Sequence, residues 1–66
     1  MMKESDILFE VGDYWVSTAK SDGLTWKGYV VWRTDLTHSK LVARIGFEGN
    51  EGLERAKQEA IKRAQH

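Results

Sequence analysis

The chain has 66 residues, with ten basic and ten acidic residues, a formal net charge of zero and no cysteine. This length fits one domain, which we place at residues 1–66 with residues 1–6 frayed, and the lack of cysteine excludes disulfides and thiolate metal sites. The balanced charge is unlike the strongly basic character of a typical nucleic-acid-binding domain. No apolar run approaches a membrane span and no signal-type segment follows the N-terminus, so we expect a cytoplasmic protein.

The strands are expected in the first two thirds of the chain. An extended segment runs over residues 7–20, and Gly12-Asp13 interrupts it as a bulge or bend. Asp and Gly favour turns, so the polar stretch 21–23 ends this segment. A second strand then runs over about 25–34 and a third over 40–47, with a hairpin loop at 35–39. The third has the cleanest alternation of apolar and polar side chains.

The last part of the chain predicts one amphipathic helix. It runs from about Glu51 to Ala64, and Asn50 is suited to cap it. Its apolar positions have helical spacing and are rich in alanine; they are Leu53, Ala56, Ala60, Ile61 and Ala64.

These elements predict an α+β fold of the order β-β-β-α, in which one face of a three-stranded antiparallel meander is covered by the C-terminal helix. Side chains alternate across a strand, so each face can be read from the sequence. We expect the helix to cover the face with more apolar side chains, which carries Trp15, Trp26, Val30, Trp32, Leu41, Ala43, Ile45 and Phe47.

The second face is then left open, and three interpretations compete. An apolar patch on an open face indicates protein binding, either to a partner or to a second copy in a homodimer; its members are Tyr14, Val16, Tyr29, Val31 and Val42. Basic residues among tyrosines instead indicate DNA binding; they are Lys27, Arg33, Lys40 and Arg44. An ordinary solvated sheet face is the third. The first is the leading hypothesis, and under it Val31→Asp abolishes association while the fold survives.

No catalytic constellation is apparent. Asp35, His38 and Ser39 have the residue types of a hydrolase triad, but all three fall in one hairpin loop, where no pocket can hold a base between a nucleophile and a carboxylate. The turn aspartates are scattered, so we expect no metal and no cofactor. The protein is thus predicted to be a non-enzymatic interaction protein.

The chain resembles the AP2-type arm-binding domain of phage tyrosine integrases in three features: three antiparallel strands before one helix, a second strand that carries Trp and Arg (residues 26–33), and a helix with Ala56, Ala60 and Ala64. This resemblance implies that the exposed sheet face docks into the major groove of DNA, with Lys27, Arg33 and Arg44 as contacts. The same architecture is similar to small phage-encoded inhibitors of host proteins, which implies a protein partner instead.

Overall fold

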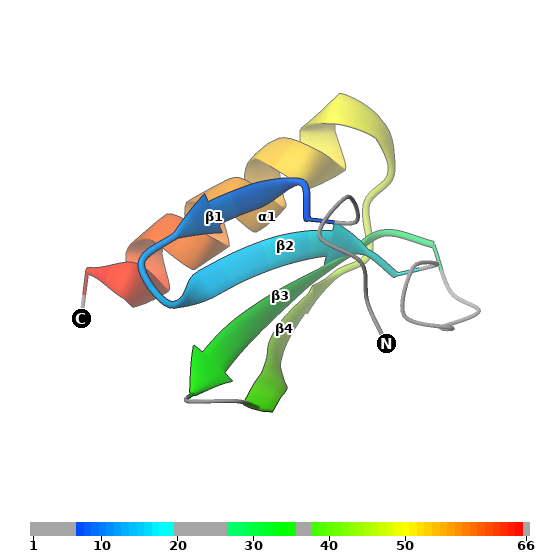
Figure 1. Ribbon diagram of the computed structural model, residues 1–66. Helices are drawn as coiled ribbons and strands as arrows, with labels where there is room; N and C mark the ends of the chain where they lie inside the picture. Colours follow the sequence, from blue (N-terminus) through cyan, green and yellow to red (C-terminus); the bar gives the residue numbers. More distant parts are fainter. Residues whose placement is uncertain (1–6, 20–26, 36–37, 66) are drawn as a thin grey trace.

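The computed structural model describes residues 7–19, 27–35 and 38–65. It is an α+β domain, in which an antiparallel sheet of order β1-β2-β3-β4 carries one C-terminal helix across one face (Figure 1). The elements are β1 (Phe9–Val11), β2 (Tyr14–Thr18), β3 (Tyr29–Asp35), β4 (His38–Ile45) and α1 (Gly49–Ala64). The predicted fold class, with an antiparallel sheet and a C-terminal helix, is therefore confirmed.

The predicted number of strands is wrong, because the first extended segment forms two strands. β1 and β2 are antiparallel with Val11 opposite Tyr14, so Gly12 and Asp13 are the two residues of a tight hairpin turn and not a bulge. Gly12 has a φ of 58°, in the left-handed region that glycine adopts at little cost. Two-residue hairpins depend on such residues, and the sheet thus gains a fourth strand.

Some other predicted boundaries shift by a few residues. β3 extends to Asp35 and β4 begins at His38, so most of the predicted hairpin loop belongs to strands. Asn50 lies inside α1 and does not cap it, because Glu48 occupies the N-cap position and makes no capping side-chain hydrogen bond. The predicted frayed N-terminus, the turn at 21–23 and Trp26 lie outside the described residues.

The core is formed where α1 lies on the middle of the sheet. Ala56 and Ala60 of α1 pack with Val16 of β2 and Val31 of β3, and all four are fully buried. Removing apolar surface from water contributes about 25 cal/mol per Å², so this contact holds the two layers together. Partly buried apolar side chains pack around it; they are Phe9, Val11, Tyr14, Tyr29, Val42, Ala43, Ile45 and Leu53.

The predicted choice of sheet face is therefore wrong. The helix covers the face of the five residues proposed as an exposed protein-binding surface, namely Tyr14, Val16, Tyr29, Val31 and Val42. Small side chains explain this choice, since an alanine stripe can approach valines closely, whereas two indoles beneath it would hold the helix away. At the helix start, the Tyr29 hydroxyl donates a hydrogen bond to the Gly49 carbonyl oxygen over 3.0 Å.

A register shift in β4 changes which of its side chains face the helix. Val31 lies opposite Ala43 and Trp32 lies opposite Leu41, so Val42 is an extra residue between the two pairs. Such a bulge reverses the alternation of side chains along the strand. Ala43 and Ile45 consequently contact the helix-covered core, while Leu41 shares the opposite face with Trp32. A strict alternation of side chains along the strand predicts that Leu41, Ala43 and Ile45 share one face.

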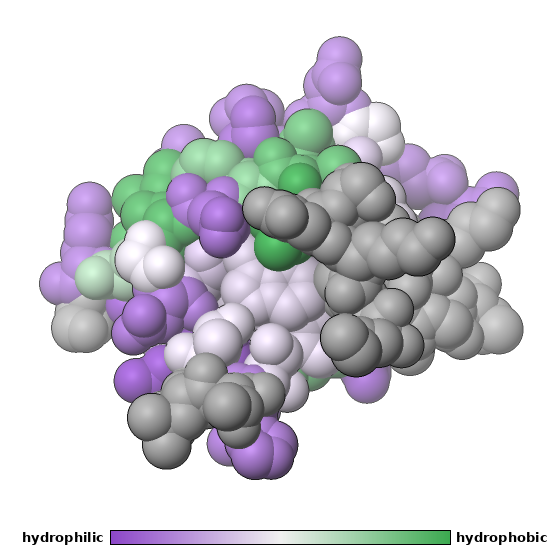
Figure 2. Space-filling view, in the orientation of Figure 1, coloured by the Kyte–Doolittle hydropathy of each residue, from purple (hydrophilic) through white to green (hydrophobic). Residues whose placement is uncertain are grey.

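The tryptophans close the face away from α1. Trp15 and Trp32 are cross-strand partners, and their rings stack with centroids 5.3 Å apart and planes inclined by 14°. The Trp15 indole N–H donates to the Thr34 hydroxyl over 2.9 Å, and the Trp32 indole N–H donates to the Ser17 hydroxyl over 3.0 Å. Val30 and Ser17 on this face are fully buried. In Figure 2, where the sheet lies in front of the helix, the centre is pale and of intermediate hydropathy.

Substituting Val31 with Asp tests the assignment of the core. A carboxylate there would be buried among apolar groups with no partner, which costs at least about 4 kcal/mol, comparable with the whole stability of a domain of this size. Thermal unfolding followed by circular dichroism should show that Val31→Asp is unfolded at 25 °C, whereas Lys40→Asp, on an exposed position of β4, stays folded. A folded Val31→Asp variant would contradict the assignment.

Candidate functional site

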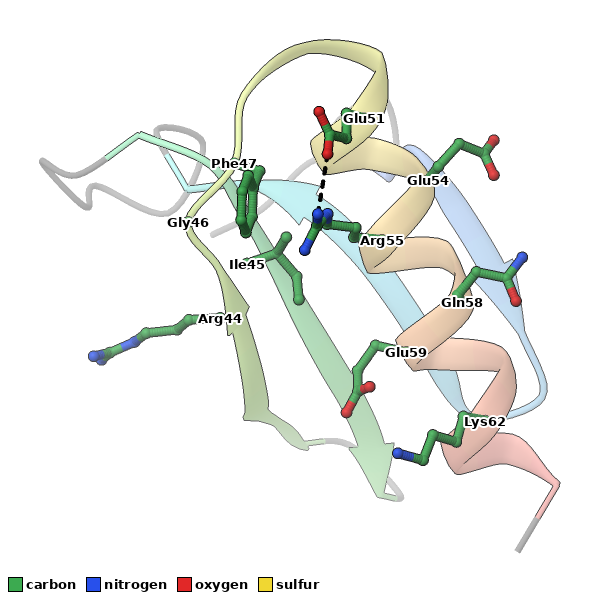
Figure 3. A pocket seen from close by; sticks show the side chains of 10 residues that line it. All are labelled: Arg44, Ile45, Gly46, Phe47, Glu51, Glu54, Arg55, Gln58, Glu59 and Lys62. Atoms are coloured by element: carbon green, nitrogen blue, oxygen red, sulfur yellow. Dashed lines mark hydrogen bonds and ion pairs between the residues drawn. The ribbon is translucent and has the colours of Figure 1, made fainter.

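A groove lies between the end of β4 and the helix, with a volume of about 510 Å³ (Figure 3). It is open to solvent along its length and lies within the size range of ligand-binding pockets. One side is supplied by the C-terminal end of β4 and the segment that follows it, and the other side by four successive turns of α1. The lining residues are Arg44, Ile45, Gly46, Phe47, Glu51, Glu54, Arg55, Gln58, Glu59 and Lys62.

An ordered aromatic-cation contact stands at one end of the groove. The Arg55 guanidinium lies 3.9 Å from the centroid of the Phe47 ring, a separation at which a cation is attracted to the ring face. Arg55 also donates a hydrogen bond over 3.0 Å to the Glu51 carboxylate, one helical turn earlier. Phe47 nevertheless remains 46% exposed. The groove therefore contains an apolar surface that the fold itself leaves uncovered.

The position of Phe47 depends on a glycine in the first turns of α1. Gly52 is buried, and a Cβ atom built on it would overlap the backbone carbonyl of Phe47 and come within 2.9 Å of the Tyr29 ring. Only a residue without a side chain lets the helix approach the chain so closely. Gly52 thus fixes the distance between α1 and the segment that follows β4.

The groove runs beside an edge of the sheet. Among the described strands β1 and β4 are the outer ones, and β4 has eight residues where β1 has three. An edge strand presents backbone N–H and C=O groups that no neighbouring strand pairs. In Figure 3 the arginine at position 44 points away from the helix, while Arg55, Glu59 and Lys62 extend from α1 toward the strands. A chain laid along β4 would lie next to these side chains.

The four basic residues predicted to bind DNA do not share one surface. Lys27 is 4.0 Å from the Glu48 carboxylate. Arg33 and Lys40 lie opposite one another on β3 and β4, on the side that α1 covers, and Arg33 lies 5.9 Å from the centroid of the Tyr14 ring. Arg44 pairs with Val30 and so belongs to the opposite face.

Sequence reasoning missed the groove because its residues belong to different patterns. The alternating pattern predicts Phe47 in the core as the last member of a strand, and Arg55 is outside the apolar stripe of the predicted helix. None of the five residues predicted for protein binding lines the groove. The feature of the sequence that could have indicated the groove is Phe47, a large apolar residue that follows the end of β4.

Within the described ranges, no three or more His, Cys, Asp or Glu residues are grouped closely enough to hold a metal ion. None of the helical residues that the structure describes forms a segment that is long and apolar enough to cross a membrane.

Comparison of the chain with protein-family models, with curated proteins and with solved structures found no match. The resemblance to the AP2-type domain was based on three strands, whereas the sheet has four.

A pair of glycine substitutions tests how the groove is held. Gly52→Ala forces a methyl group against the Phe47 carbonyl, and overpacking of this kind lowers the free energy of unfolding by about 1–3 kcal/mol. The Tm should fall by roughly 4–8 °C for each kcal/mol lost at this chain length. Gly46→Ala is the control, since a Cβ there meets no atom within 4 Å and should leave Tm unchanged or slightly raised. Equal Tm values for the two variants in calorimetry would contradict the close approach of α1.

Proposed function

We propose that the protein is a small non-enzymatic binding module that accepts an extended segment of a protein partner along the edge of β4. The segment would add a strand to the sheet, with backbone hydrogen bonds giving affinity and alternate side chains giving specificity. The observation that carries the proposal is the coincidence of the long outer strand with an open groove and a half-exposed Phe47.

The location of the remaining apolar surface supports the edge over either face of the sheet. One face is covered by α1, and on the other Trp15 is only 9% exposed while both indole N–H groups have acceptors. Phe47 and Leu8 are the large hydrophobic side chains that stay exposed among the described residues. Since Phe47 lines the groove, a partner there would bury apolar surface in addition to pairing its backbone.

The dispersion of the basic residues favours a protein over DNA as the partner. A DNA-binding sheet needs its cations on one surface facing the phosphates. Here Arg44 lies on the opposite face from Arg33 and Lys40, and Lys27 is close to Glu48. A protein segment running along the edge, in contrast, can meet residues that project from both sides of the same strand.

Blocking the groove with one large side chain tests the proposal. Gln58 is an exposed lining residue of α1, so Gln58→Trp should occupy the groove and leave the fold intact. The protein is immobilised and incubated with a nuclease-treated lysate of its native cells. We expect a retained partner whose amount falls at least about tenfold with Gln58→Trp, the loss of about 1.4 kcal/mol of binding free energy.

The matched control is Gln65→Trp, the same substitution at an exposed position beyond the end of α1 and outside the groove. It should retain the partner at the wild-type level. A partner that both variants retain equally would place binding elsewhere on the molecule. A second incubation uses untreated lysate, and material that is retained from it but lost after nuclease treatment would favour the DNA-binding alternative.

A further inference from the structure

We infer that the segment taken up by β4 is acidic, with an apolar residue followed one and four positions later by Asp or Glu. The inference depends on the proposed strand addition and specifies the chemistry of the partner. Three features carry it, namely the charge of the edge, the register of the strand and the composition of the groove.

The edge of the sheet is cationic. The stretch from His38 to Phe47 contains Lys40 and Arg44 and no acidic residue. Lys40 also lies directly opposite Arg33 in the β3–β4 pairing, and like charges facing each other across strands are destabilising. An acidic side chain on the other side of Lys40 would offset this repulsion. The strand therefore favours an anionic neighbour.

The bulge in β4 sets the spacing of the acidic residues. Along β3, the partners of Ile45, Arg44 and Lys40 are Tyr29, Val30 and Arg33, because Val42 is passed over. A new strand that follows β4 with the same register places its residues one, two and five beside Ile45, Arg44 and Lys40. Residues one and five then point to the helix side and residue two to the other, as their neighbours on β4 do.

The composition of the groove agrees with this pattern. Ile45 and Phe47 offer an apolar surface to the first residue of the segment. The glutamates of the helical wall do not oppose an acidic segment, because each already holds a cation. The pairs are Glu51–Arg55 at 3.0 Å, Glu54–Lys57 at 3.6 Å and Glu59–Arg63 at 3.2 Å.

A second copy of the chain fits the same edge poorly. An antiparallel pair of β4 strands would bring Lys40 and Arg44 of both copies, four cations in all, to one seam. Like charges this close to one another repel. Lys residues and bulges are common means of preventing self-pairing of edge strands. The charge thus favours an acidic partner over a homodimer.

Three peptides test the inference by NMR titration of the ¹⁵N-labelled protein at low ionic strength. The acidic peptide is acetyl-Thr-Thr-Val-Glu-Thr-Val-Glu-Thr-Thr-amide, and the other two have Lys or Thr in place of both Glu residues. We expect the acidic peptide to shift the amide signals of β4 and to bind about tenfold more tightly than the lysine peptide, from two exposed charge pairs of up to about fivefold each. The difference should shrink as salt is added.

Variants of the strand supply the control. Lys40→Glu with Arg44→Glu should reverse the preference, so that the lysine peptide binds more tightly, and Lys40→Gln with Arg44→Gln should remove it. Lys27→Glu gives the same change in net charge as the double glutamine variant, at a residue that does not line the groove, and it should keep the wild-type order. Circular dichroism verifies that each variant is folded.

The outcomes separate this inference from the proposed function. If all three peptides shift the β4 signals with equal affinity, strand addition holds and the acidic specificity is wrong. If none of them shifts these signals, both fail. If the protein alone forms dimers through β4, seen as a molecular mass of twice that of the chain in light scattering, a second copy is the occupant and the inference is overturned.

Discussion

Two alanines of α1 resting on two valines of the sheet determine the rest of the structure. Ala56, Ala60, Val16 and Val31 are all fully buried, and none of them has a side chain larger than that of valine, so the helix can lie close to the strands. The larger aromatic residues lie around the edge of this contact. One of them, Tyr29, donates a hydrogen bond to the carbonyl oxygen of Gly49, the first residue of the helix. Close packing of small groups gains dispersion energy that a void would forfeit.

A sheet that uses its only described helix on one face must bury its other apolar face differently. Here the two tryptophans lie against one another across β2 and β3, and each indole N–H finds a hydroxyl acceptor on the same face. Stacked aromatic pairs add about 0.5–1.5 kcal/mol beyond the area that they bury. Because both faces are closed in these ways among the described residues, we propose that recognition uses the edge at β4 and the groove beside it.

The local patterns of the sequence predicted the helix and the extended segments, because helical spacing and extended stretches are properties of neighbouring residues, but they did not predict the number of strands. The face could not be predicted, because both sides of β3 are apolar and only the fit of alanines to valines decides between them. The turn at Gly12 and the bulge at Val42 were missed for a related reason: a glycine-aspartate pair suits a bend or a hairpin equally, and a bulge depends on pairing with β3. The groove could not be predicted from the sequence, because its position depends on the order of the strands and on where Phe47 leaves the sheet.

The face that the helix covers can be measured directly by nuclear Overhauser effects in the labelled protein. The methyl groups of Ala56 and Ala60 should show strong effects to the methyl groups of Val16 and Val31, which lie in one buried cluster with them. The indole protons of Trp15 and Trp32 should show none to these alanines. Strong effects between the alanine methyl groups and the indole rings would contradict the account, and with it the position of the groove and the edge.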